Sequence, residues 1–252
     1  MAERGKSAAR YWGVDVARGV AMAMVALYHL VFDLDNFGGY PVDSTGGFWA
    51  VFADASAFAF VFLAGLSLSI SHARDGEAGL RGRGLFAKYL RRGARIFLWG
   101  MLITAVFLAL DYGYVIFGIL HLIGLSIVLA YPFLGLRYPN LIAGLAVIAA
   151  GLYVRAEGFA AGGAAGVLLS PLGILPENIL MPDYRPLLPW FGVLLLGLFF
   201  GNAFYLSRKG APAAPPPLAA PIAFVGRHTL FVYLVHQPVL IATLWAVGIV
   251  RF

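Results

Sequence analysis

The chain has 252 residues, of which 61% are apolar and only 12% are charged, with 18 Lys and Arg against 12 Asp and Glu. Soluble domains are roughly 45–50% apolar and about 25% charged, so this composition excludes a disordered chain and argues strongly against a soluble enzyme. The sequence has no cysteine, which excludes disulfides and thiolate nucleophiles, and its basic surplus fits the loops of a membrane protein better than a nucleic-acid-binding surface.

Long apolar stretches predict membrane-spanning helices, each of which needs about 20 mostly apolar residues. We therefore predict an all-α, polytopic transmembrane bundle of about seven spans that forms a single integral-membrane domain over residues 1–252. The Gly- and Pro-rich segment 159–175 leaves three interpretations open: an eighth span, a re-entrant segment or a lid on the membrane. The seven spans are expected at 12–33, 48–71, 91–110, 114–134, 139–154, 187–206 and 221–249.

Charges in the connections between the spans predict the orientation of the bundle. Basic residues precede the first span and fill the second connection, whereas the first and third connections contain Asp and no Lys or Arg. Under the positive-inside rule, this alternation predicts a cytoplasmic N-terminus, and the compact size and short loops favour a prokaryotic inner membrane. The charges used are Arg4, Lys6, Arg10, Arg74, Arg81, Arg83, Lys88, Arg91, Arg92, Arg95, Arg137, Arg208 and Lys209 against Asp35, Asp43 and Asp111.

Four ionisable residues lie within the first predicted span: Asp15, Arg18, His29 and Asp33. At about 100° per residue they fall on one stripe of the helix. Because ionisable groups are costly in lipid, this stripe is expected to face the protein interior or a watery cavity. Arg18 and His29 are about 16 Å apart along the axis, which is too far for a catalytic pair but suits two ends of one elongated ligand.

His29 and Asp33 are four residues apart, so their side chains can meet on the helix. A carboxylate beside a histidine fixes its tautomer and raises its basicity, as general base catalysis requires. Asp54, at the outer start of the second span, is the alternative orienting carboxylate. Structural explanations stay open for all three residues. Asp33 would lie in the outer headgroup region and His29 would form a hydrogen bond to a neighbouring helix. Asp54 would complement the dipole of its own helix.

Two further histidines, His121 and His236, lie within predicted spans and are additional candidates for the site. The histidines do not have the spacing of a standard metal site, so no metal is expected.

A basic cluster occupies the predicted cytoplasmic start of the third span, within a helical sector of about 100°. One interpretation is snorkelling side chains that set the topology. The other is an anion site for the phosphates of a cytosolic, nucleotide-bearing donor, because Arg binds phosphate through paired hydrogen bonds. The cluster consists of Lys88, Arg91, Arg92 and Arg95.

The run VDVARGV at residues 14–20, continued to His29, resembles the first span of membrane acyltransferases. In the acyltransferase-3 family an Arg and a His in that span are separated by ten residues, and Arg18 and His29 match this spacing. Taken together, the chain most resembles small prokaryotic members of the heparan-α-glucosaminide N-acetyltransferase-like family. The likeness continues, in order, over residues 54–65, 88–99, 117–121, 186–202 and 226–233.

The resemblance implies transfer of an acetyl group from cytosolic acetyl-CoA to a sugar amine or hydroxyl of an envelope glycan or glycolipid. It places the catalytic histidine at His29, with Arg18 as the matching arginine. Our hypothesis is that His29 acts as general base or acetyl carrier and that His121 or His236 polarises the thioester or holds the acceptor. The donor phosphates would then meet Arg18 and the basic cluster.

The alternative hypothesis is a transporter or carrier of a small or lipid-linked substrate, which a striped charged helix and a broken segment also suit. A purely structural subunit is a third hypothesis, and four aligned ionisable residues argue against it. The expected partners are acetyl-CoA, the acceptor and the bilayer, with no nucleic acid. The abundant small-residue faces are compatible with a homodimer.

Overall fold

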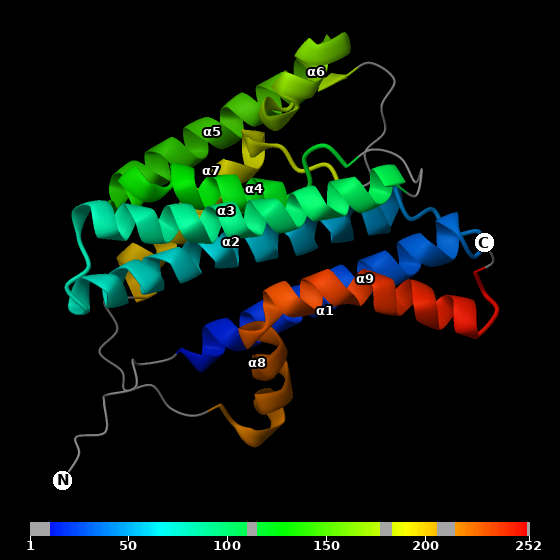
Figure 1. Cartoon of the computed structure of the whole chain (residues 1–252), viewed down its shortest axis with the longest axis horizontal. Coiled ribbons are helices and arrows are strands. Elements are labelled where there is room, and N and C mark those ends of the chain that lie inside the picture. Colours follow the sequence, from blue (N-terminus) through cyan, green and yellow to red (C-terminus); the bar gives the residue numbers. More distant parts are fainter. Residues whose placement is uncertain (1–10, 110–114, 177–182, 206–214, 251–252) are drawn as a thin grey trace. The chain divides into compact units, whose positions relative to one another are not determined.

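The computed structural model describes residues 11–109, 115–176, 183–205 and 215–250, and these are predominantly helical (Figure 1). The helices are α1 (Trp12–Asn36), α2 (Gly47–Glu77), α3 (Gly82–Ala109), α4 (Ile119–Leu129), α5 (Tyr138–Glu157), α6 (Gly163–Leu169), α7 (Leu187–Phe200), α8 (Ala220–Arg227) and α9 (Thr229–Ala246). The predicted all-α class is confirmed. The charges at Arg4, Lys6, Arg10, Asp111, Arg208 and Lys209 lie outside the described residues, and the orientation stays a prediction.

Six of the described helices are long and apolar enough to cross a membrane, which agrees with a polytopic bundle of about seven spans. These six are α1, α2, α3, α5, α9 and the segment Leu187–Tyr205, in which α7 continues into a π-helical turn at Gly201–Tyr205. The predicted span 114–134 contains the 11-residue helix α4, followed by a 3-10 turn at Tyr131–Phe133. At 1.5 Å per residue α4 is only about half as long as the hydrocarbon core is thick.

The predicted spans 91–110 and 221–249 differ from the helices of the structure. The third helix begins at Gly82 rather than at residue 91, so the basic cluster lies inside α3 and not at its start. Hydropathy detects only the apolar part of such a helix, although Arg and Lys are good helix formers. The predicted span 221–249 is divided at His228 into α8 and α9.

Segment 159–175 folds into short elements rather than a long helix. Two-residue strands, β1 (Ala160–Ala161) and β2 (Leu175–Pro176), pair in parallel around α6 and a 3-10 turn at Ser170–Leu172. The helical part, Gly163–Leu172, is about 15 Å long, against a hydrocarbon core of about 30 Å. The structure therefore argues against an eighth helical span here, and the re-entrant and lid interpretations stay predictions.

The chain divides into two compact units, one of Met1–Leu63 with Gly210–Phe252 and the other of Ala64–Lys209. In the first unit, α1 packs against α8 and α9 (Figure 1). Two glycines bring α1 and α8 into close contact. A Cβ atom on Gly19 would lie 2.1 Å from the carbonyl oxygen of Ile222, and one on Gly226 would lie 1.6 Å from that of Asp15. Small residues of this kind let helix backbones approach closely.

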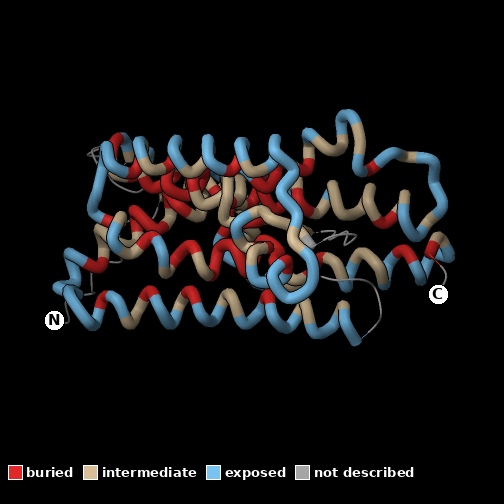
Figure 2. The backbone as a smooth tube through the Cα atoms, turned by 90° about the horizontal axis from the view of Figure 1, so that it is seen from above, coloured by how far each residue is buried: buried red, intermediate tan, exposed pale blue. Residues whose placement is uncertain are grey.

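In the second unit, α3 packs against α4, and α5 packs against α7. Glycines again lie at the crossings, because a Cβ on Gly93 would be 2.5 Å from the carbonyl oxygen of Gly124, and one on Gly192 would be 2.5 Å from that of Gly144. Exposed positions recur along the long helices (Figure 2), and many of them carry large apolar side chains such as Leu98 and Ile142. Apolar side chains on the outside of a helical bundle are what a lipid environment requires.

Candidate functional site

Two histidines from distant parts of the chain meet in the first unit. His29 of α1 and His236 of α9 have ring centroids 4.9 Å apart, with the ring planes at 82°. Nδ1 of His29 lies 2.9 Å from the carbonyl oxygen of Val25, and Nδ1 of His236 lies 2.6 Å from that of Tyr233. Because a carbonyl oxygen only accepts hydrogen bonds, each Nδ1 carries the ring proton and donates the hydrogen bond. In the neutral rings both Nε2 atoms therefore present a lone pair, the form that a general base needs.

Asp33 lies in the same cluster and has no exposed surface. Its Oδ1 accepts a hydrogen bond from Nε2 of Gln237 at 2.7 Å, and the carboxylate interacts electrostatically with His29. The predicted neighbourhood of His29 and Asp33 is thus present in the structure, and complete burial places Asp33 inside the protein rather than on its surface. Whether the pair is catalytic stays a prediction.

Three buried atoms of this cluster have no hydrogen-bond partner among the described residues: Asp33 Oδ2, Gln237 Oε1 and His236 Nε2. Given the tautomer of His236, all three are acceptors. An unsatisfied buried acceptor costs about 1–3 kcal/mol, so the cluster is suited to a group that brings N–H or O–H donors.

Asp54, the alternative orienting carboxylate, lies half-buried in the part of α2 that belongs to the first unit. Its role stays a prediction. Asp33 is the carboxylate for which the structure describes an interaction with His29.

Arg18 lies on α1 and reaches the start of α9. Its Nη2 donates to Oγ1 of Thr229 at 2.5 Å, and Thr229 is buried at the first residue of α9, directly after the break at His228. The two residues Arg18 and His29 are thus both on α1, about 16 Å apart along its axis. Phosphate binding by Arg18 stays a prediction.

Thr229 and Gln237 were not among the residues predicted for the site. A usable signal was present for both, since polar residues within an apolar segment are functional candidates by default. Thr229 follows a helix break, and Gln237 directly precedes Pro238, which lies inside α9.

His121 belongs to the second unit and has the opposite tautomer. Its Nδ1 accepts a hydrogen bond from the backbone N–H of Gly118 at 3.2 Å, so in the neutral ring Nε2 carries the proton. Its ring lies 5.0 Å from that of Phe97, and a Cβ atom on Gly100 would come within 2.9 Å of it. Asp183 lies nearby, where its carboxylate accepts from the backbone N–H of Ile119 at 3.2 Å. His121 is therefore arranged as a donor, a form that suits polarising a carbonyl, and that role stays a prediction.

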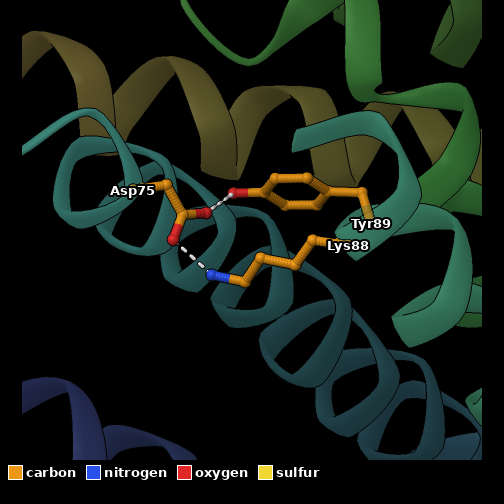
Figure 3. A network of polar contacts seen from close by, with 3 residues as sticks. All are labelled: Asp75, Lys88 and Tyr89. Atoms are coloured by element: carbon orange, nitrogen blue, oxygen red, sulfur yellow. Dashed lines mark hydrogen bonds and ion pairs between the residues drawn. The ribbon is translucent and has the colours of Figure 1, made fainter. Parts of the chain in front are cut away.

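The basic cluster of α3 has an acidic partner that the sequence analysis did not identify. Asp75, near the end of α2, forms an ion pair with Lys88 and accepts a hydrogen bond at 3.0 Å from the hydroxyl of the buried Tyr89 (Figure 3). Arg92 is half-buried and interacts electrostatically with Asp75 and Tyr89. The available signal was an acid, Asp75, just after the predicted span 48–71 and within a mostly basic connection.

Arg91 and Arg95 are exposed, unlike Arg92. Nε of Arg91 donates to the carbonyl oxygen of Ala87 in its own helix at 3.2 Å. Within the cluster, Lys88 is thus committed to a protein carboxylate, while Arg91 and Arg95 present their charge at the surface. Anion binding by the cluster stays a prediction.

We expect Asp75→Asn to lower the free energy of unfolding by about 1–2 kcal/mol. The substitution removes the charge that faces Lys88 and weakens the bond from Tyr89, and hydrogen bonds to charged groups contribute about 1.5–3 kcal/mol. Lys88 keeps 40% of its side chain exposed, so solvent screening reduces the contribution of the ion pair itself. Equilibrium unfolding by SDS in mixed micelles measures the difference.

The matched control is Glu77→Gln, which removes an exposed acid from the same helix end and is expected to change stability by less than about 0.5 kcal/mol. Equal stability of Asp75→Asn and wild type would show that the Asp75 contacts do not hold α2 and α3 together.

One comparison with known proteins gives a match. The family model described as "Heparan-alpha-glucosaminide N-acetyltransferase, catalytic" matches residues 10–238. No curated protein and no solved structure shows significant similarity to the chain. The matched range contains all of the predicted site residues and also Thr229 and Gln237. The chain therefore belongs to the heparan-α-glucosaminide N-acetyltransferase catalytic family, and it is an integral membrane protein of an acetyltransferase family.

Proposed function

We propose that the protein transfers the acetyl group of cytosolic acetyl-CoA to an amine or hydroxyl of a sugar in an envelope glycan or glycolipid. The observation that carries this proposal is the tautomer of His29. Its Nδ1 is engaged with the carbonyl of Val25, so its Nε2 presents a lone pair beside His236 and the carboxylate of Asp33.

In the direct reaction, the lone pair of the acceptor nitrogen or oxygen attacks the thioester carbonyl carbon, and a new C–N or C–O bond forms. The proton of the acceptor passes to Nε2 of His29, the C–S bond breaks, and coenzyme A leaves with the electron pair on sulfur. Return of the proton from His29 to the thiolate completes the cycle. In the alternative route, Nε2 itself attacks the thioester and carries the acetyl group before the acceptor takes it. Both routes need the same lone pair.

The acceptor-only character of the cluster supports a sugar as the second substrate. Asp33 Oδ2, Gln237 Oε1 and His236 Nε2 together accept hydrogen bonds from an amine or from neighbouring hydroxyls. A carboxylate among them favours an amine, which is protonated for most of the time at neutral pH and gives up its proton before attack.

We further propose two separate candidates for binding the phosphates of acetyl-CoA, which are Arg18 in the first unit and the basic cluster of α3 in the second. Guanidinium groups pair with phosphate through two hydrogen bonds, and the exposed Arg91 and Arg95 are free of the carboxylate that engages Lys88. This assignment agrees with a cytoplasmic N-terminus, for which both sets of charges were predicted to lie on the cytosolic side.

Two measurements on the purified protein in detergent test the function. The first is calorimetric titration with acetyl-CoA, in which Arg92→Ala is expected to weaken binding about tenfold and His29→Ala to leave it nearly unchanged. Arg81→Ala, an exposed arginine just before α3, is the charge-matched control. The second is mass-spectrometric detection of acetylated product with glucosamine and with N-acetylglucosamine, which separates amine from hydroxyl acceptors.

Binding by wild type that is weakened at Arg92, together with an acetylated sugar, supports the proposal. A well-folded wild type that neither binds acetyl-CoA nor acetylates either sugar would contradict it. Movement of an unmodified substrate across liposomes by the same protein would then favour the transporter hypothesis.

A further inference from the structure

Gln237 is a half-buried amide in the predominantly apolar helix α9, between His236 and Pro238. Its Nε2 donates to Oδ1 of Asp33 at 2.7 Å, which joins α9 to α1 across 204 residues of sequence. The donor is the amide nitrogen, because a carboxylate only accepts. The bond therefore determines the orientation of the amide and directs its Oε1 to the other side.

The bond also acts on the charge state of Asp33. An N–H donor stabilises the ionised carboxylate, and it occupies Oδ1 while Oδ2 stays without a partner. The two histidines cannot serve Oδ2 through Nδ1, because both Nδ1 atoms donate to backbone carbonyls. Oδ2 is thus available to a group that gains a proton during the reaction or brings one to it.

We propose that Gln237 is a positioning residue for the acetyl transfer, which holds Asp33 as an oriented carboxylate beside His29. This inference rests on the proposed function. When His29 accepts the proton of the acceptor, the ring becomes positive, and the fixed negative charge of Asp33 stabilises that state at low cost in reorganisation. A glutamate at position 237 would place two carboxylates in direct contact, and an apolar side chain would leave Oδ1 without its donor.

The first test measures the tautomer and protonation of the histidines in the absence of catalytic turnover. Ring-nitrogen NMR of histidine-labelled full-length protein in detergent reports the tautomer and protonation of each ring, and His→Asn or His→Ala variants assign the signals. In Gln237→Met we expect the His29 signals to move in the same sense as in Asp33→Asn. Thr243→Val is the matched control, since Thr243 is an exposed residue of α9 whose hydroxyl donates to the carbonyl oxygen of Val239 in its own helix. Unchanged His29 signals in a folded Gln237→Met protein would overturn the proposal.

The second test separates positioning from a merely structural bond. Gln237→Met is expected to lower kcat about 10- to 100-fold, with KM for acetyl-CoA within about twofold of wild type, because a small misplacement near a reacting group has an effect of this size. The double variant Asp33→Asn with Gln237→Glu reverses the polarity of the bond: the amide now lies on α1 and the carboxylate on α9.

If Gln237 positions Asp33 for chemistry, the double variant recovers the stability lost in the single variants, while the folded Gln237→Met protein keeps its low kcat. If the bond only joins two helices, folded Gln237→Met loses stability but keeps the kcat of wild type, and the proposal is wrong. Should wild type show no transfer with any sugar, the proposed function fails, whereas the ring-nitrogen test still decides whether Gln237 controls the environment of His29.

Discussion

His29→Ala is expected to lower kcat for acetyl transfer by about 10³-fold while the protein stays folded and binds acetyl-CoA. General acid–base catalysis by a positioned side chain contributes about 10²–10⁴-fold, and His29 presents an Nε2 lone pair on a ring that interacts with Asp33 and lies next to His236. Initial rates at saturating acetyl-CoA, with size-exclusion profiles as the folding check, measure the effect.

His228→Ala is the matched control for this substitution. Nδ1 of His228 lies 2.9 Å from the carbonyl oxygen of Phe224, four residues earlier, which repeats the local bond between His29 and Val25, but His228 is exposed. Loss of that bond alone should therefore change kcat less than about threefold. A folded His29→Ala protein with wild-type turnover would remove His29 from the mechanism.

The same pair of proteins separates the two chemical routes. If His29 carries the acetyl group, wild type incubated with acetyl-CoA and no acceptor gains the mass of one acetyl group, and His29→Ala does not. If His29 is a general base, neither protein gains that mass.

Gly226→Ala is expected to lower the free energy of unfolding by about 3 kcal/mol or more. The added Cβ would lie 1.6 Å from the carbonyl oxygen of Asp15, and that oxygen belongs to the backbone of α1, which a rotamer change cannot move away. Overpacking costs about 1–3 kcal/mol where side chains can adjust, and a backbone clash lies at or beyond the upper end of that range. Unfolding by SDS in mixed micelles measures the loss.

Gly76→Ala is the control, because a Cβ at Gly76 would have no neighbour within 4 Å. Ala is the better helix former by about 1 kcal/mol, so this variant should be as stable as wild type or slightly more stable. The two substitutions are chemically identical and are expected to change stability in opposite directions. Equal effects would show that α1 and α8 are not held at the distance the structure gives.

Gly226→Ala should also weaken acetyl-CoA binding if Arg18 holds the donor. Gly226 lies three residues before Thr229, the partner of Arg18, so displacement of α8 from α1 disturbs the position of that guanidinium. The dissociation constant for acetyl-CoA, measured by calorimetry, is then expected to be higher for Gly226→Ala than for wild type.

The three histidines show how the backbone assigns chemistry to identical side chains. Nδ1 of His29 and of His236 each faces a carbonyl oxygen, so each neutral ring presents an accepting Nε2. Nδ1 of His121 faces a backbone N–H at the start of α4, so its Nε2 is a donor. From the sequence, His29 was predicted as the base, and His121 and His236 shared one auxiliary role. The structure separates these two, because His236 presents an accepting Nε2 and His121 a donating one.

Much of the architecture was predictable from the sequence because it follows from local properties. Apolar segments of about 20 residues predict spanning helices whatever their neighbours are, and helical periodicity alone places Arg18, His29 and Asp33 on one stripe. The family likeness, too, was visible in the run from residue 14 to His29, and the match over residues 10–238 confirms it.

Only the tertiary structure decided which residues meet that stripe. The bond from Gln237 to Asp33, the contact of His29 with His236 and the pairing of Lys88 with Asp75 depend on how helices pack, and helix packing is not encoded in the periodicity of either partner. The break at His228 was hidden for a related reason, since α8 and α9 are both apolar and a hydropathy window joins them into one span. Composition and spacing therefore determined that the chain is a helical membrane protein with a charged first helix. The packing of α9 against α1 decided that His236 and Gln237 complete the cluster around His29.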